Sequence, residues 1–105
     1  MWCVDIDAKK IEGLNRGEIP IYEPGLNDLL SSGISTGNLR FSSDISAAVA
    51  QSDIVMVMFD TPVDDNDGVI LDPVFDTVAA ITGSLKEHSV LHLTSQIPVG
   101  STRRI

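Results

Sequence analysis

Polar residues stand at the ends of the apolar runs in this sequence, where side chains of a parallel sheet can meet a ligand. Asp5 closes the first apolar run, and Asp60 and Thr61 follow the run Ile54–Phe59. In open α/β sheets the carboxyl ends of the strands border the ligand crevice. Carboxylate and hydroxyl groups can form hydrogen bonds with a ligand, so if Ile54–Phe59 is a central strand, Asp60 and Thr61 stand at the edge of a binding site.

The elements that would position these residues follow from hydrophobic periodicity. Six consecutive apolar residues, Ile54–Phe59, fit a strand buried on both faces, as in a parallel sheet covered by helices. Pro62 cannot donate to a ladder, so the strand must end before it. Asp7 and Asp72 are expected as helix N-caps, with Pro73 in the first turn. We expect strands at about 2–6, 39–42, 54–59 and 89–93, and helices at about 8–15, 24–32, 44–51 and 72–82.

The order of these elements predicts the fold class. Strands that alternate with helices indicate an α/β fold, a Rossmann-like parallel sheet flanked by helices and joined by right-handed crossovers. The 105 residues contain no internal repeat, low-complexity tract or linker, so we expect one domain over residues 1–105.

Charge and cysteine content exclude several classes of protein. The net charge of −8, from 7 basic and 15 acidic residues, disfavours nucleic acid and anionic membrane surfaces as partners. No apolar run approaches the roughly 18 residues that span a bilayer. The N-terminus does not have the pattern of a signal peptide. Cys3 is the single cysteine, which suits a reducing compartment, and a cytoplasmic location is the expectation.

Other residue types that could carry chemistry fit structural roles better. Cys3 lies in an apolar run and is expected to be a buried small hydrophobe. His88 and His92 are four residues apart at the start of a strand, with no acid suitably placed for a metal site. The acidic loop with Asp64, Asp65 and Asp67 lacks a closing glutamate, so a solvated loop is expected rather than a calcium site. We therefore expect neither a metal nor a catalytic residue.

Several longer motifs carry a resemblance to a known family. They are VDID at Val4–Asp7, LNRGEIPIYEPGL at Leu14–Leu26, GNLRFSSD at Gly37–Asp44, TPVDD at Thr61–Asp65 and SQIPVGST at Ser95–Thr102. With their spacing kept over nearly the whole chain, the sequence resembles the nucleotide-sugar dehydrogenases, which include the UDP-glucose and GDP-mannose 6-dehydrogenases. The match is to the second part of their N-terminal NAD-binding domain.

The resemblance implies an activity and a cofactor. Members of this family oxidise the C6 alcohol of a nucleotide sugar to a carboxylate in two NAD-dependent steps, and a C-terminal domain holds the substrate. Their first strand and its G-x-G-x-x-G turn should precede Trp2, and their catalytic glutamate, lysine and cysteine should lie beyond Ile105. We therefore expect a fragment of the cofactor domain that is inactive alone and binds NAD weakly.

The resemblance also assigns roles to the residues at the strand ends. Asp5 would accept hydrogen bonds from the adenosine ribose, the alternative being a loop acid or helix cap. Lys10 would reach the adenosine side of NAD, or be a plain exposed helix lysine. Thr61 would lie beside the pyrophosphate and ribose, or cap local backbone. Gln96 stands where many members have a threonine that holds a catalytic water, and Asp60 replaces an expected small residue.

Two other functional classes compete with this interpretation. The chain could be a non-catalytic Rossmann-like packing or assembly module, or a decayed gene product. A strand edge left unpaired favours association, so a homo-oligomer is among the expected partners. A different Rossmann dehydrogenase, such as a hydroxyacid type, is a further alternative that the PIYEPGL motif argues against.

Overall fold

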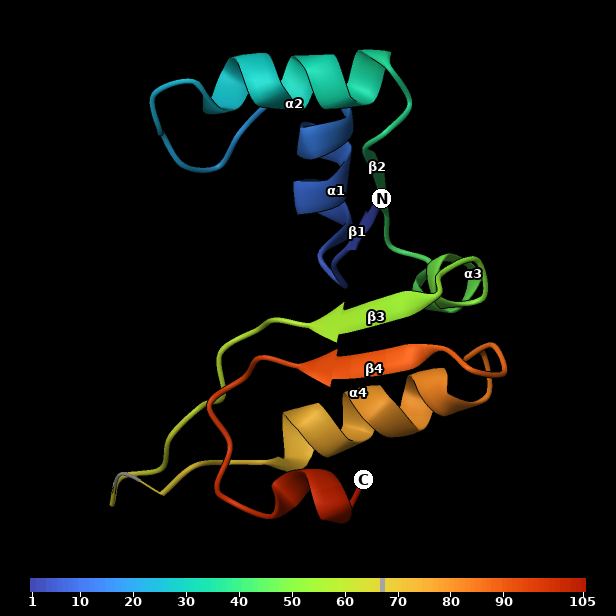
Figure 1. The fold of residues 1–105 in the computed structure, drawn as a ribbon. Coiled ribbons are helices and arrows are strands. Elements are labelled where there is room, and N and C mark those ends of the chain that lie inside the picture. The colour runs from blue at the N-terminus through green and yellow to red at the C-terminus, as the bar shows by residue number, and fades with distance from the viewer. Residues whose placement is uncertain (67) are drawn as a thin grey trace. The chain divides into compact units, whose positions relative to one another are not determined.

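The computed structural model describes residues 1–66 and 68–105, which form two compact units, Met1–Ala48 and Val49–Ile105. The elements are β1 (Trp2–Val4), α1 (Ala8–Asn15), α2 (Leu26–Ser35), β2 (Arg40–Ser42), α3 (Ile45–Val49), β3 (Ile54–Val57), α4 (Asp72–Thr82), β4 (Val90–Leu93) and a short 3-10 helix, η1 (Ser101–Arg103) (Figure 1). Both strand pairs are parallel, and helices connect their members. The predicted α/β class is confirmed.

In the first unit, β1 and β2 pair in parallel, with Trp2 opposite Arg40. The chain leaves β1 and enters α1 through the predicted N-cap. The Asp7 carboxylate accepts hydrogen bonds from the backbone amides of Lys9 and Lys10, at 3.0 and 3.1 Å. Gly17, with φ of 81°, follows the end of the helix in the left-handed conformation that favours glycine. The predicted bounds of this helix, 8–15, are therefore confirmed.

The second helix begins later than predicted. Pro24 was expected in its first turn, but α2 starts at Leu26, whose amide donates to the Glu23 carbonyl at 3.2 Å. Gly25 has φ of 83°, a left-handed conformation that an α-helix cannot contain. Pro24 and Gly25 thus occupy the central positions of a turn of the type that favours proline followed by glycine. The PIYEPGL motif encodes that turn.

The same helix also ends later than predicted. The loop expected from Gly33 is wrong, because α2 continues to Ser35. Gly33 lies within the helix, and a Cβ added there would meet the Leu39 side chain at 3.0 Å. Gly33 therefore allows close packing against Leu39. The prediction ended the helix before Gly33 because glycine often terminates helices. Gly37, with φ of 70°, makes the turn that follows.

In the second unit, β3 and β4 pair in parallel, with Ile54 opposite Val90 and Val57 opposite Leu93. Figure 1 shows α4, the crossover helix, running alongside β4. The most buried apolar side chains of α4 are Val74, Val78 and Ile81. Val57 on β3 is also buried. Together these side chains form the apolar core of the second unit.

One face of β3 is exposed, contrary to the prediction that Ile54–Phe59 is buried on both faces. Ile54 and Met56 are 63% and 49% exposed, whereas Val57 is 5% exposed. Side chains of a strand alternate between the faces of the sheet. Within the described residues, only one of these faces is well buried.

The start of α4 also differs from the prediction. Leu71 is the N-cap residue, without a side-chain cap bond, and Asp72 is the first residue of the helix. Asp72 thus lies in the first turn, where a negative charge is favourable for the helix dipole. Pro73 lies in that turn, as predicted. Gly83 ends the helix with φ of −68°.

Asp44 precedes α3, and its carboxylate accepts a hydrogen bond from the Ala47 amide at 2.9 Å, as an N-cap should. The helix ends at Val49, earlier than the predicted Gln51. Within the part of the chain that the structure describes, no helix combines the length and apolar character needed to cross a bilayer.

Candidate functional site

The carboxylate of Asp5 stands directly beyond the last residue of β1. Its Oδ1 accepts the Asp7 backbone amide at 3.0 Å, and its Oδ2 accepts the Lys10 ammonium at 2.7 Å. The hydrogen bond from Lys10 is the main reason that the pKa of Asp5 lies below its ordinary value, and the Asp7 amide adds to it. Asp5 is therefore held as a carboxylate at the strand end.

Lys10 reaches this carboxylate from the first turn of α1. The same contact raises the pKa of Lys10, chiefly through the hydrogen bond to Asp5. The Asp5 and Lys10 side chains remain 35% and 44% exposed. The structure thus brings together two of the four predicted site residues and leaves both accessible to a ligand.

The hydrogen-bonding capacity of Asp5 is not exhausted by these contacts. An ionised carboxylate has about four lone-pair sites. Here the Asp7 amide and the Lys10 ammonium each donate to it, and a backbone hydrogen bond from Ile6 also lowers its pKa. The side chain stays partly exposed, so a further donor such as a hydroxyl group can reach it.

Thr61 and Gln96, the other two predicted residues, also meet. The Thr61 hydroxyl donates to the backbone carbonyl of Gln96 at 2.7 Å. Because that proton is already donated, the Thr61 oxygen is left to accept a hydrogen bond from a ligand. Donation of that proton to a ligand anion would require this bond to break. Gln96 takes part through its main chain, and it is exposed.

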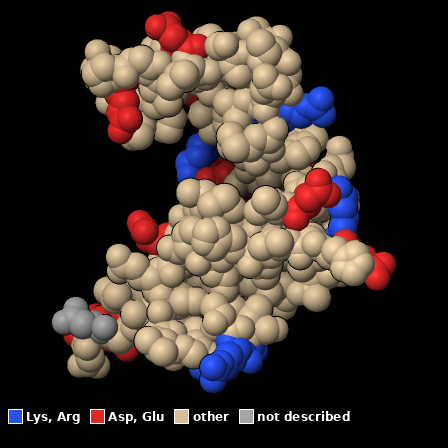
Figure 2. Space-filling model, in the orientation of Figure 1, with Lys and Arg blue, Asp and Glu red and all other residues tan. Residues whose placement is uncertain are grey.

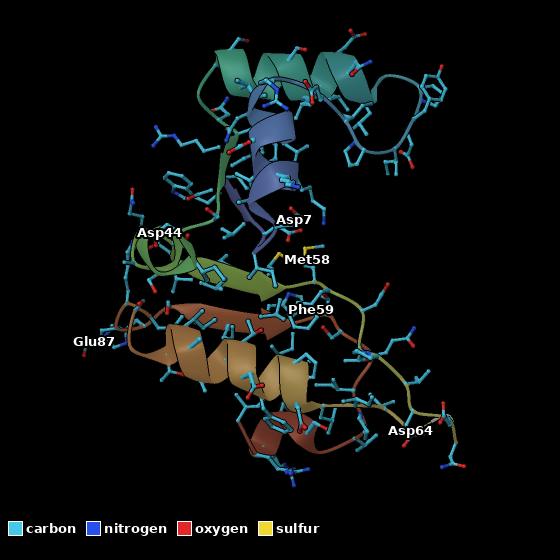
Figure 3. All side chains as sticks on the ribbon, turned by 180° about the vertical axis from the view of Figure 1, so that it is seen from behind. Asp7, Asp44, Met58, Phe59, Asp64 and Glu87 are labelled. Atoms are coloured by element: carbon cyan, nitrogen blue, oxygen red, sulfur yellow. The ribbon has the colours of Figure 1, made fainter. Side chains whose placement is uncertain are left out.

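Two neighbouring hydroxyl groups, which were not among the predicted site residues, add to this contact. Thr94 donates to the Val57 carbonyl at 2.9 Å, and Ser95 donates to the Phe59 carbonyl at 2.7 Å. Phe59 follows the end of β3, as Figure 3 shows. Hydroxyl residues placed directly after an apolar strand are the signal that could have identified them.

The acidic loop after β3 is shaped by one of its own carboxylates. Asp64 Oδ1 accepts the amides of Asn66 and Gly68 at 2.9 and 2.7 Å, and Figure 3 shows Asp64 in the loop between β3 and α4. Asp67 lies outside the described residues. In the remainder of the chain, no three His, Cys, Asp or Glu side chains are grouped so as to hold a metal ion.

Cys3 and His88 have environments that differ from each other. Cys3 is half-buried in β1, and burial raises the pKa of its thiol, so the uncharged form is favoured. His88 is exposed, and its Nε2 lies 3.6 Å from a carboxylate oxygen of Glu87.

Basic side chains occupy separate places on the face shown in Figure 2 and form no continuous patch there.

Each unit offers a hydrogen-bond acceptor at a strand end. In the first unit Asp5 offers an ionised carboxylate, and in the second unit Thr61 offers a hydroxyl oxygen. None of the eight glycines belongs to a G-x-G-x-x-G turn, the motif that cradles a pyrophosphate. Asp5 and Lys10 belong to the first unit, and Thr61 and Gln96 belong to the second.

Solved structures of dehydrogenases have the same fold. A GDP-mannose dehydrogenase from Pseudomonas aeruginosa, solved as a ternary complex, matches 99% of this chain with a TM-score of 0.85 and 31% identity. A UDP-glucose dehydrogenase from Pyrobaculum islandicum matches 95% of it with a TM-score of 0.85 and 26% identity. In both cases the match covers 24% of the longer protein.

Sequence comparison leads to the same group. The UDP-glucose 6-dehydrogenase of Rhizobium meliloti (strain 1021) is 40% identical over 100 residues, which are 94% of this chain and 23% of that protein. The GDP-mannose 6-dehydrogenase of Pseudomonas savastanoi pv. phaseolicola is 38% identical over 89 residues, 85% of this chain and 20% of that protein. The chain thus spans about a quarter or less of the length of these relatives. Residues 1–105 match the NAD-binding domain of the UDP-glucose/GDP-mannose dehydrogenase family, and the chain belongs to that family.

Proposed function

We propose that this chain is a partial NAD-binding domain of a nucleotide-sugar 6-dehydrogenase and that it holds the adenosine half of NAD. In the whole enzyme the C6 alcohol of a UDP- or GDP-sugar would be oxidised to a uronate. The names of the relatives, which include UDP-glucose and GDP-mannose 6-dehydrogenases, support this reaction and substrate class.

The observation that carries the proposal is the ionised Asp5 carboxylate at the carboxyl end of β1. Asp5 would accept a ribose hydroxyl at its exposed carboxylate, while the Asp7 amide and Lys10 hold it in place. Lys10 also limits the negative charge near the dinucleotide phosphates. A neutral pair is a better neighbour for an anion than a lone carboxylate.

The second unit would contact the central part of NAD. Thr61 would accept a hydrogen bond from a ribose hydroxyl, because its own proton is donated to Gln96. The Gln96 amide would face the reaction side, where it can donate and accept hydrogen bonds. Bound NAD supplies the hydride acceptor, and none of these residues is proposed to take part in hydride transfer.

The chain alone is therefore expected to be inactive and to bind NAD weakly. We place it in the cytoplasm, consistent with the single cysteine and the acidic composition. The competing function is a non-catalytic packing or assembly module that associates through an unpaired strand edge. Within the described residues β3 pairs only with β4, which leaves its other edge unpaired, and Ile54 and Met56 on its face are exposed; these observations favour this alternative.

Saturation-transfer NMR with NAD tests the proposal, since it detects weak ligands. We expect saturation on the adenosine protons to exceed that on the nicotinamide protons. Asp5→Asn should weaken binding about 10- to 100-fold, the effect of losing a hydrogen bond to a charged group. Glu12→Gln is the matched control, because it removes a carboxylate from an exposed position of α1.

The outcomes of these measurements distinguish NAD binding from a role as an assembly module. A wild-type chain that gives no NAD signal but forms oligomers on size-exclusion chromatography would support the assembly module. Tight binding in a calorimetric titration would contradict the expected partial site. Equal loss of signal in the Asp5 and Glu12 variants would show that overall charge, rather than the strand-end carboxylate, governs binding.

A further inference from the structure

Hydroxyl groups continue the pairing of β3 and β4 beyond the end of their backbone ladder. A late ladder bond runs from the Thr94 amide to the Val57 carbonyl at 3.0 Å. Beyond it, Ser95 donates to the Phe59 carbonyl and Thr61 donates to the Gln96 carbonyl, both at 2.7 Å. These hydrogen bonds join residues that are 35 and 36 positions apart in the chain.

The direction of these bonds shows that both segments contribute to the contact. Ser95 donates from the β4 side to the β3 side, and Thr61 donates in the reverse direction. Thr94 adds a side-chain bond to the Val57 carbonyl, at 2.9 Å, that reinforces its own amide bond. We name the three hydroxyl bonds of Thr61, Thr94 and Ser95 the rim clasp.

The sequence explains why side chains perform this task. Pro62 and Pro98 follow closely on the two strands and carry no amide hydrogen, so a ladder cannot continue through them. Strand carbonyls beyond the last ladder bond would otherwise need water as a partner. A serine or threonine hydroxyl supplies a donor without requiring strand geometry.

We propose that Thr61 and Ser95 are positioning residues that fix the segments 58–62 and 94–97 against each other before NAD arrives. This inference rests on the proposed function, because the ordered rim is the edge at which the dinucleotide would bind. The rim clasp removes conformational freedom in the free protein, so binding does not have to order these segments. The hydroxyl proton of Thr61 serves the rim, and its oxygen is the atom left for the ligand.

The test removes each hydroxyl with little change of shape. Thr61→Val and Ser95→Ala abolish the donors, whereas Thr61→Ser and Ser95→Thr keep them and should restore the wild-type behaviour. Ser89→Ala is the matched control. Ser89 also donates to a main-chain carbonyl, that of Lys86 at 2.9 Å, but it precedes the amino end of β4.

The primary measurement is backbone amide hydrogen exchange, by NMR, on the chain without ligand. We expect exchange in segments 58–62 and 94–97 to rise about fivefold in the two donor-free variants, the effect of one net hydrogen bond on local opening. The two hydroxyl-retaining variants and the Ser89 control should match the wild type. Unchanged exchange in the donor-free variants would overturn the rim clasp, whatever NAD does.

Titration with NAD supplies the second measurement. Affinity should fall by a similar factor of about five in Ser95→Ala, and by more in Thr61→Val because that variant also loses the oxygen left for the ligand; it should recover in the hydroxyl-retaining variants. Faster exchange with unaltered NAD affinity would overturn the positioning role. If the wild type fails to bind NAD, the proposed function fails, while the exchange data still decide whether the rim clasp exists.

Discussion

Two glycines of the second unit make a sharp test of the backbone geometry. Gly100, in the SQIPVGST motif, has φ of 89° and precedes η1, whereas Gly83 has φ of −68° and ends α4. A Cβ added at either position would meet nothing within 4 Å. Alanine at the two sites therefore differs in backbone strain and not in steric contact.

The difference in φ determines whether alanine lowers or raises the free energy of unfolding at each glycine. Alanine in the left-handed region costs about 1 to 2 kcal/mol, so Gly100→Ala should lower the free energy of unfolding by that amount. Gly83→Ala should raise it by about 0.4 to 1 kcal/mol, because alanine reduces the freedom of the unfolded chain at a φ that it readily adopts.

Urea unfolding monitored by circular dichroism measures both variants against the wild type. The slope of the free energy against urea concentration should stay constant, so that the midpoint alone moves, downward for Gly100→Ala and upward for Gly83→Ala. Shifts of the same sign in both variants would refute the assignment of strain to Gly100. A variant such as Gly100→Asn should lose less than alanine, since asparagine tolerates the left-handed region better.

Three further predictions concern the Asp5 carboxylate, a helix cap and the core. Lys10→Gln should raise the pKa of Asp5 toward its ordinary value in a carbon-13 NMR titration. Because that pKa is lowered in the folded protein, the stabilisation it gives is present above about pH 4 and is lost as the pH falls through the folded pKa. Asp7→Ala should cost about 1 kcal/mol, measured by thermal unfolding, and Asp7→Ser should recover most of it. Ile81→Ala should cost about 2 to 5 kcal/mol and Ile81→Val about 0.5 to 1.5 kcal/mol in urea unfolding, because the side chain is 2% exposed.

A helix was predicted correctly where the sequence contains a signal for each of its two ends. The first helix was predicted to the residue because Asp7 caps one end and Gly17 follows the other. The start of the second helix was wrong because proline is common both in a first helical turn and in a tight turn. Gly25, which follows Pro24, distinguishes a tight turn from a first helical turn, because its positive φ is incompatible with an α-helix.

Contacts between residues far apart in the chain could not be predicted from sequence patterns. The apolar run Ile54–Phe59 predicted a strand, but it carries no information on which face another element covers. The exposed Ile54 and Met56 show the consequence. The hydrogen bond from Thr61 to Gln96 joins residues 35 apart, and its direction depends on where both strands end. Family motifs named the residues, and only the structure shows that Thr61 donates to a carbonyl.

Local charge explains how so acidic a chain can accommodate an anionic dinucleotide. The net charge of −8 acts at long range, where salt screens it over about 10 Å. At the end of β1 the nearest charges are a matched pair, Asp5 and Lys10, 2.7 Å apart. Asp7 is directed to the amides of α1, where its charge offsets the helix dipole. We therefore expect the acids of this strand end to act as hydrogen-bond acceptors whose charge is already balanced, which is what the proposed contact with a ribose beside its own phosphate requires.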